Sequence, residues 1–326
     1  MPIFGLGKKS GGMAAKPRME IGDGDPVVLT LITSANRHDW PTVRAILARH
    51  PDDEVSTLLH AMAENAPDIH GWLTAKRDEA PDDPLAHLAL GAVTVSHAWH
   101  VRTSSRPQHV SRDQFKQFHA LLREAEEHLY RAVELAPDSA APWSYLVTSG
   151  RGLQMEADIV RRRFEAATDR CAHHRRAHQQ MLQFLCRKWS GSHEEMHEFA
   201  AAAAAGPHWG RLAHLVAIAH LERWLELPVG TERSAYMKQP AVQKELSEAA
   251  DLSIFQPGWS DPRSPYAEPN LFAMTLSLAG LPTDARRAFE LTDGMVTRFP
   301  WSYINGRDQV TLFTLWRDKA RSARSA

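Results

Sequence analysis

One pattern of small and apolar residues recurs five times along this chain of 326 residues. Each copy places such residues at positions i, i+4 and i+7, which share one face of an α-helix. The copies begin 35, 36, 46 and 43 residues apart and are Ala125-Leu129-Ala132, Val160-Phe164-Ala167, Met196-Ala200-Ala203, Val242-Leu246-Ala249 and Ala285-Phe289-Thr292. A repeat of this length is typical of stacked helix pairs, and it predicts an all-α fold of the α-solenoid kind.

The composition favours helices and argues against several kinds of partner. Strong helix formers dominate, while β-branched and aromatic residues are sparse. The formal net charge is -1, so no global field attracts the chain to nucleic acid or to an anionic membrane. No run of about 18 apolar residues predicts a membrane span. We therefore expect neither nucleic acid nor a membrane as a partner.

The cysteines and the first residues indicate the compartment. Cys171 and Cys186 are the only two cysteines in the sequence, which is too few for a disulfide framework. The first residues also lack the continuous apolar segment of a secretory signal. Together these features predict a cytoplasmic protein.

The chain divides into a tail, a helical domain and a short end. Residues 1–24 are predicted to be a disordered tail, residues 25–320 the helical-repeat domain and residues 321–326 a frayed C-terminus. Helix boundaries follow from apolar periodicity, N-capping residues and proline stops. The predicted pairs are 85–100/111–136, 140–151/157–171, 176–189/193–205, 209–226/240–253 and 269–279/283–299, with a last helix at 303–321. The long connections 101–110, 227–239 and 254–268 are expected to be functional or disordered.

Several segments resemble the tetratricopeptide repeat (TPR). The segment AEEHLYRAVELAPD at 125–138 resembles the second helix and exit of that repeat, Leu90-Gly91 resembles its first helix, and AGLPTDARRAFE at 279–290 resembles its inter-helix turn. The segment KWSGSHEEMHEFA at 188–200 is also similar to part of an actinobacterial TPR-like family of unknown function. The resemblance implies a TPR-like α-solenoid of antiparallel helix pairs that binds a protein or peptide, and it implies no cofactor.

The string His193-Glu194-Glu195-Met196-His197 matches the H-E-x-x-H pattern of zinc proteases. In such a protein both histidines bind Zn²⁺, and the glutamate activates the bound water. Glu222 is available downstream as a third ligand. However, Ser192 and Glu195 form a capping-box pattern, which predicts that the helix begins at the motif itself. We favour the capped helix and no metal, keeping His193, His197 and Glu222 as the metal candidates.

Cationic residues gather in the segment 151–188, which has nine Lys or Arg residues against four acidic ones. Arginines at this density can clamp a carboxylate, an acidic peptide or a phosphate. A solvated outer face with salt bridges is the structural alternative. If the first helix of each pair lines a concave groove, the candidate ligand-binding residues are Arg151, His178, Arg187, Lys188, Arg211, His214 and Arg223.

The sequence thus favours a protein that binds a protein or peptide, with an acidic or carboxylate-bearing ligand in a basic, histidine-containing groove. An enzyme or small-ligand protein with its site in the same groove remains the alternative, ahead of a zinc-dependent protein using the HEEMH segment. The sequence contains no phosphate-binding glycine loop and no G-x-S-x-G motif. No catalytic residue is therefore assigned.

Overall fold

The structure is a computed structural model that describes residues 15–103, 110–206, 209–304 and 308–323. These residues form helices and no β-strand, as the sequence predicts. One isolated parallel bridge joins Arg18 and Met295. The predicted tail lies partly outside the described residues, at 1–14, as does the end of the chain at 324–326.

Most helices match the predicted ranges to within a few residues. The first half of the chain forms η1 (Ile21–Gly24), α1 (Pro26–Asn36), α2 (Trp40–Arg49), α3 (Asp52–Asn65), α4 (His70–Glu79), α5 (Pro84–Arg102), α6 (Arg112–Leu135) and α7 (Ala141–Gly152). The second half forms α8 (Ala157–Arg170), α9 (Arg175–Leu185), α10 (His193–Ala205), α11 (Trp209–Leu212), α12 (His214–Glu226), α13 (Thr231–Tyr236), α14 (Pro240–Leu252), α15 (Ala267–Ala279), α16 (Pro282–Leu291), α17 (Arg298–Trp301) and α18 (Gln309–Ser322).

Three regions differ from the predicted helices, the first being the last helix of the chain, predicted for 303–321, which begins at Gln309. The predicted connection 227–239 contains the short helix α13, which the apolar pattern does not reveal because α13 has no buried residue. The predicted helix 283–299 stops at Leu291, and Asp293 and Gly294 then adopt positive φ angles. A positive φ angle is incompatible with a continuing right-handed helix.

The recurring helix signature marks the buried face of the second helices. Ala125, Leu129 and Ala132 of α6 are fully buried, and the corresponding residues of α14 and α16 are also buried. Gly91 of α5 faces this stripe, because a Cβ atom there would lie 2.8 Å from the side chain of Leu129. The small residues therefore allow α5 and α6 to pack closely.

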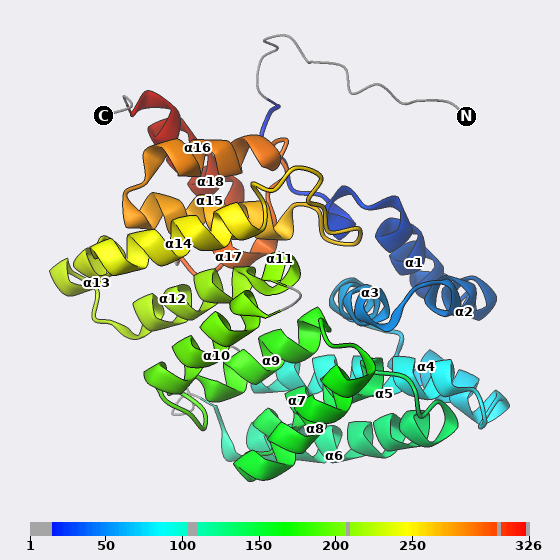
Figure 1. The fold of residues 1–326 in the computed structure, drawn as a ribbon. Helices are drawn as coiled ribbons and strands as arrows, with labels where there is room; N and C mark the ends of the chain where they lie inside the picture. Colours follow the sequence, from blue (N-terminus) through cyan, green and yellow to red (C-terminus); the bar gives the residue numbers. More distant parts are fainter. Residues whose placement is uncertain (1–14, 104–109, 207–208, 305–307, 324–326) are drawn as a thin grey trace.

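Helices that follow one another in the sequence contact one another along the molecule (Figure 1). α5 packs against α6, α7 against α8 and α15 against α16. The earlier helix of each such pair also contacts its counterpart in the next, as α5 does with α7 and α7 with α9. One hydrophobic cluster extends from α1 to α7 and a second from α7 to α18.

The segment before α1 contacts the C-terminal part of the helical domain. Arg18 exchanges backbone hydrogen bonds with Gly294 and Val296, so the segment before α1 lies beside the C-terminal helices (Figure 1). The loop between α14 and α15 reaches the N-terminal helices, where Arg263 forms ion pairs of 3.2 Å with Asp25 and with Glu54. This proline-rich loop therefore connects distant parts of the sequence.

Candidate functional site

Two tryptophans and two arginines meet where α5 and α7 approach the turn after α9. The rings of Trp99 and Trp189 pack edge to face with centroids 5.5 Å apart. The guanidinium carbon of Arg151 lies 4.4 Å from the centroid of Trp99 and 5.1 Å from that of Trp189. Arg102 lies 5.1 Å from Trp189 and 5.6 Å from Trp99. We call these four residues the arginine–tryptophan cluster.

Neither arginine of this cluster forms an ion pair with a carboxylate among the described residues. Arg151 donates a hydrogen bond of 3.0 Å to the neutral side chain of Gln180, and Arg102 donates one of 3.0 Å to the carbonyl oxygen of Thr103. The Nε atoms of both arginines and the indole nitrogens of both tryptophans are buried without a hydrogen-bond partner. The direct contacts of these two positive charges are therefore with aromatic rings and neutral acceptors.

Desolvation acts on both of these cations. Burial lowers the pKa of Arg151 to about 10, although the charge of Glu222 acts in the opposite direction. Burial also lowers the pKa of Arg102. Both guanidinium groups remain charged near neutral pH, and a negative ligand would replace part of the hydration that they have lost.

Lys188 and Glu222 form a second, neutralised group beside the cluster. Glu222 is buried, and one of its carboxylate oxygens lies 2.5 Å from Nζ of Lys188. The other oxygen accepts hydrogen bonds from Gln183 at 2.7 Å and from Tyr303 at 3.2 Å. Both oxygens of the Glu222 carboxylate are thus occupied, by three side chains of the fold.

A further cation extends this basic region. Arg176 of α9 lies with its guanidinium carbon 4.6 Å from the ring centroid of Tyr145, and it forms no ion pair within the described part of the chain. Its charge adds to the desolvation that lowers the pKa of Arg151. Arg102, Arg151 and Arg176, which form no ion pair among the described residues, therefore make this part of the molecule positively charged.

The structure places the predicted binding residues in different environments. Arg151 and Lys188 both lie near Glu222. Arg187 and Arg211 are exposed. Among the described residues, the nearest carboxylate oxygen to Arg211 is that of Asp53, at 4.0 Å. His178 is buried between aromatic rings and bonds to the carbonyl oxygen of His174. His214 is buried 3.1 Å from Glu268, and Arg223 lies near His193 and His197.

The HEEMH segment begins α10, and Ser192 accepts a hydrogen bond of 3.1 Å from the backbone of Glu195. The N-cap is therefore present, and this bond is one of the two that make up the predicted capping box. The three metal candidates of the sequence do not come together. His193 lies 3.3 Å from Glu226, Glu222 binds Lys188, and His197 lies against the ring of His220. Glu222 and Glu226 lie one turn apart on α12, and they contact different side chains, Lys188 and His193.

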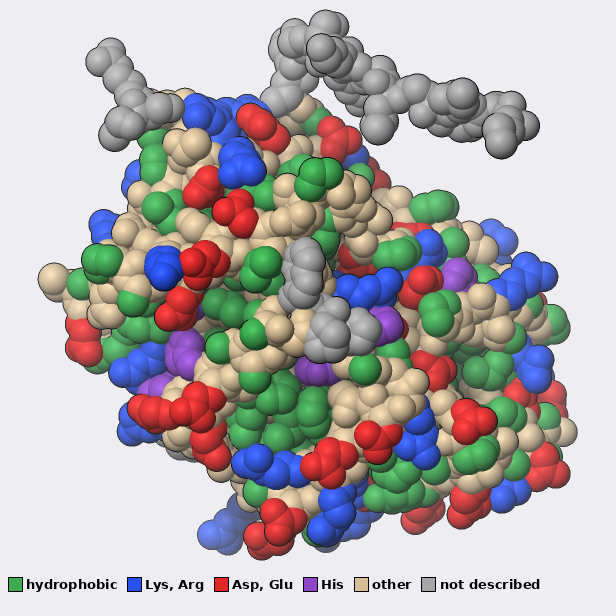
Figure 2. Space-filling view, viewed as in Figure 1, with side chains coloured by type: hydrophobic (Ala, Val, Ile, Leu, Met, Phe, Trp, Pro, Cys, Tyr) green, Lys and Arg blue, Asp and Glu red, His purple; other side chains and the backbone are tan. Residues whose placement is uncertain are grey.

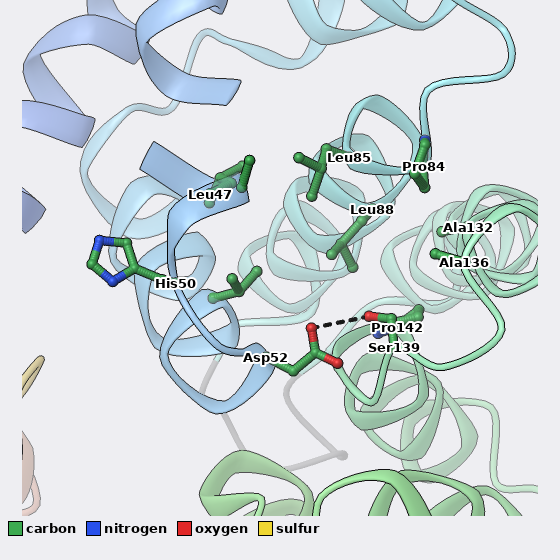
Figure 3. A pocket seen from close by; sticks show the side chains of 12 residues that line it. Leu47, His50, Asp52, Pro84, Leu85, Leu88, Ala132, Ala136, Ser139 and Pro142 are labelled. Atoms are coloured by element: carbon green, nitrogen blue, oxygen red, sulfur yellow. Dashed lines mark hydrogen bonds between the residues drawn. The ribbon is translucent and has the colours of Figure 1, made fainter. Parts of the chain in front are cut away.

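Two pockets lie away from the arginine–tryptophan cluster. One of about 650 Å³ lies between α12, α13, α15 and α18 and is lined by Trp224, Trp316 and Arg233 among others. A smaller one of about 200 Å³ lies between α2, α5 and α6 (Figure 3). Its Asp52 bonds to Ser139 at 3.2 Å, so its one carboxylate is used to hold the start of α7.

Charge is mixed over the visible surface. Figure 2 shows acidic and basic side chains interspersed over one face of the molecule, without a large area of one sign. Ligand attraction would therefore come from a local group of charges rather than from the field of the whole protein.

Comparisons with known proteins do not assign this site. No protein-family model matches the chain, and no curated protein matches it. None of the described helices combines the length and the hydrophobicity that crossing a lipid bilayer requires.

Sequence reasoning identified Arg151 and Lys188 but missed Trp99, Arg102 and Trp189. Their signal is only a tryptophan near the end of an apolar helix, followed by an arginine three residues later. That spacing places Trp99 and Arg102 on one helix face, but it does not show that Arg151 and Trp189 complete the cluster.

Proposed function

We propose that this chain is a TPR-like helical-repeat protein that binds an acidic segment of a partner protein, with the arginine–tryptophan cluster as a principal contact. The observation that carries the proposal is the pair of desolvated guanidinium groups without a carboxylate partner. With two free cysteines, a reducing compartment such as the cytoplasm belongs to the same proposal.

The chemistry of the cluster favours a carboxylate. A buried arginine within a fold is normally paired, because an unpaired charge in a poorly hydrated site costs free energy. Arg151 instead has Gln180 and two indole rings around it. Carboxylates match the planar guanidinium group with two parallel hydrogen bonds, so an acidic side chain is the ligand whose chemistry suits this arginine best.

The packing order of the helices supports the repeat interpretation. The earlier helix of each pair contacts the earlier helix of the next, from α5 to α7 and from α7 to α9. In helical-repeat proteins such a layer presents an extended surface to a ligand. Arg151 on α7, Arg176 on α9 and Trp99 on α5 all belong to this layer. An extended acidic peptide could therefore contact several pairs at once.

A direct test measures binding of a fluorescently labelled glutamate-rich peptide to the full chain by anisotropy, at low and high salt. We expect binding that weakens as salt increases. The substitution Arg151→Gln should reduce the affinity by at least about tenfold, which is the size of a lost charge-assisted hydrogen bond.

The matched control is Arg162→Gln, which removes the same charge from an exposed position on α8. It should change the affinity by no more than about twofold, as expected of an exposed charge. Equal affinities of wild type and Arg151→Gln, or no binding of the peptide by wild type, would contradict the proposal.

Competition by free citrate distinguishes a peptide-binding protein from a protein that binds a small carboxylate ligand. If the cluster binds a small carboxylate ligand, citrate should compete with the peptide at stoichiometric concentrations. If the cluster is one contact of an extended peptide site, citrate should compete only weakly, because it reaches one part of that site.

A further inference from the structure

Four helices bring two histidines, a tyrosine and a glutamate together at a place separate from the arginine–tryptophan cluster. They are His197 of α10, His220 of α12, Tyr236 at the end of α13 and Glu245 of α14. The imidazole rings of His197 and His220 have centroids 4.7 Å apart. We call these residues the histidine cluster; Figure 2 shows histidine side chains at the surface in the region of α10 and α12.

The ligand atoms of three of these residues converge. One nitrogen from each histidine and one oxygen of Glu245 all lie within 4.8 Å of one another. Nε2 of His220 is 2.8 Å from the Glu245 carboxylate, while its Nδ1 is 2.8 Å from the hydroxyl of Tyr236. Ligand atoms about 2 Å from a tetrahedral ion lie roughly 3.3 Å from one another, so side-chain shifts that move Glu245 and His220 slightly apart and draw the set together would suit a bound metal ion.

Both histidines are in the protonation state that a metal requires. Desolvation lowers the pKa of His220 to about 4, and desolvation together with the neighbouring His220 lowers that of His197 to about 4. Near neutral pH each imidazole is therefore uncharged and has a nitrogen lone pair. Two neutral imidazoles and one carboxylate are a ligand set that suits Zn²⁺ and related divalent transition metals.

We propose that His197, His220 and Glu245 bind a divalent transition-metal ion, with Zn²⁺ as the ion that fits them best. Tyr236 would act from outside the ligand set. When Nε2 of His220 binds the metal, its Nδ1 carries the proton and donates it to the Tyr236 hydroxyl oxygen, which fixes the ring. Three protein ligands leave one position of a tetrahedral ion open.

The neighbouring side chains limit the affinity for a metal ion but leave a route to the ligand atoms. Arg223 lies close enough for its charge to add to the desolvation that lowers the pKa of His197. This cation disfavours a second positive charge but would favour an anionic fourth ligand on the metal. Glu245 is half exposed, so the ion has a route from solvent.

This site differs from the zinc motif that the sequence suggested. Only His197 of the HEEMH segment takes part, whereas His193 pairs with Glu226 and Glu222 with Lys188. The two interpretations therefore predict different effects of substitution at His193 and Glu245.

The test is calorimetric titration of the chelator-treated full-length chain with Zn²⁺, with Co²⁺ as a spectroscopic probe and Mg²⁺ as a comparison. We expect one Zn²⁺ per chain by ligand count, absorption bands of Co²⁺ bound to nitrogen and oxygen, and no binding of Mg²⁺. Absence of Zn²⁺ binding by wild type would overturn the proposal.

Substitutions identify the ligands. Glu245→Gln and His197→Gln should each weaken Zn²⁺ binding by at least about tenfold, a typical effect in metal sites. His193→Gln and Glu248→Gln, on the next turn of α14, should leave binding unchanged. Far-ultraviolet circular dichroism verifies that each variant is folded. Binding lost in His193→Gln but kept in Glu245→Gln, or kept in all variants, would refute the assignment.

Discussion

Arg151 on α7 and Arg175 at the start of α9 are arginines of neighbouring helices in opposite electrostatic environments. Arg175 lies 2.8 Å from the carboxylate of Asp261 and also forms an ion pair with Glu268. Desolvation lowers its pKa, but the charges of Glu268, Asp261 and Asp53 outweigh this effect and the pKa is raised. For Arg151 desolvation prevails and the pKa falls to about 10.

The difference separates a structural arginine from one that is available to a ligand. Arg175 connects α9 to the loop between α14 and α15, so its carboxylate partners come from distant parts of the sequence. Arg151 connects to no carboxylate of the described residues and contacts indole rings instead. The same substitution at both positions should therefore have unequal effects.

The largest effect is expected from Arg175→Met. This change leaves Glu268, which is 1% exposed, without its cationic partner. An uncompensated buried charge of this kind costs about 3–5 kcal/mol. Urea denaturation followed by circular dichroism measures the change in the free energy of unfolding.

The double variant Arg175→Met/Glu268→Gln is the control for this prediction. It removes the charges of Arg175 and Glu268 and should recover part of the lost stability, because the fully buried carboxylate no longer lacks a partner and only the more exposed Asp261 has lost its cation. A loss below about 1 kcal/mol in the single variant would show that the Arg175 network contributes no more than a surface ion pair.

The contrast between these arginines could not be read from the sequence, although the helices could. Helix boundaries follow from local signals such as Asp25 before Pro26 and Ser111 before α6, and both side chains cap their helices as expected. The buried stripe of α6 follows from the spacing of small residues in the same way. These features depend on residues within one or two helical turns, so periodicity is sufficient to predict them.

The site depends on contacts that are distant in sequence. Arg175 and Arg176 are adjacent, yet Arg175 faces the loop with Asp261 and Arg176 faces Tyr145 of α7. A local excess of positive charge identifies the segment but does not show which arginine meets a carboxylate. His214, predicted to bind a ligand, lies beside Glu268 of α15, a neighbour that no local pattern reveals.

An intermediate effect on the free energy of unfolding is expected from a change of pH, through His174 next to Arg175 at the start of α9. His174 is fully buried, 3.2 Å from the hydroxyl of Ser56, and its pKa is lowered mainly by desolvation, from 6.5 to about 4. The unfolded chain therefore binds a proton more readily than the folded chain. The contribution of His174 is complete above pH 6.5 and is lost as the pH falls toward 4.

Denaturation at pH 7.5 and 5.5 measures this loss, which linkage puts at about 1.4 kcal/mol for His174 at the lower pH. His174→Asn keeps an N-cap acceptor but does not titrate, so its stability should fall less between the two pH values. Other buried histidines contribute equally to both proteins and cancel in the comparison. Identical pH dependence of wild type and variant would show that His174 is not neutral in the fold.

The smallest effect on stability is expected from Arg151→Met, the counterpart of Arg175→Met. Loss of the guanidinium removes cation–π contacts worth about 0.5–2 kcal/mol, together with the hydrogen bond to Gln180. It also relieves the desolvation of an unpaired cation, and a methionine side chain can pack against Trp99 and Trp189. These contributions oppose each other, so the free energy of unfolding should change by less than about 1 kcal/mol.

A loss as large as that of Arg175→Met would mean that Arg151 stabilises the fold, and the unpaired charge would then no longer indicate a ligand. A small change, combined with lost affinity for the acidic peptide in Arg151→Gln, would separate the two arginines by function as well as by environment.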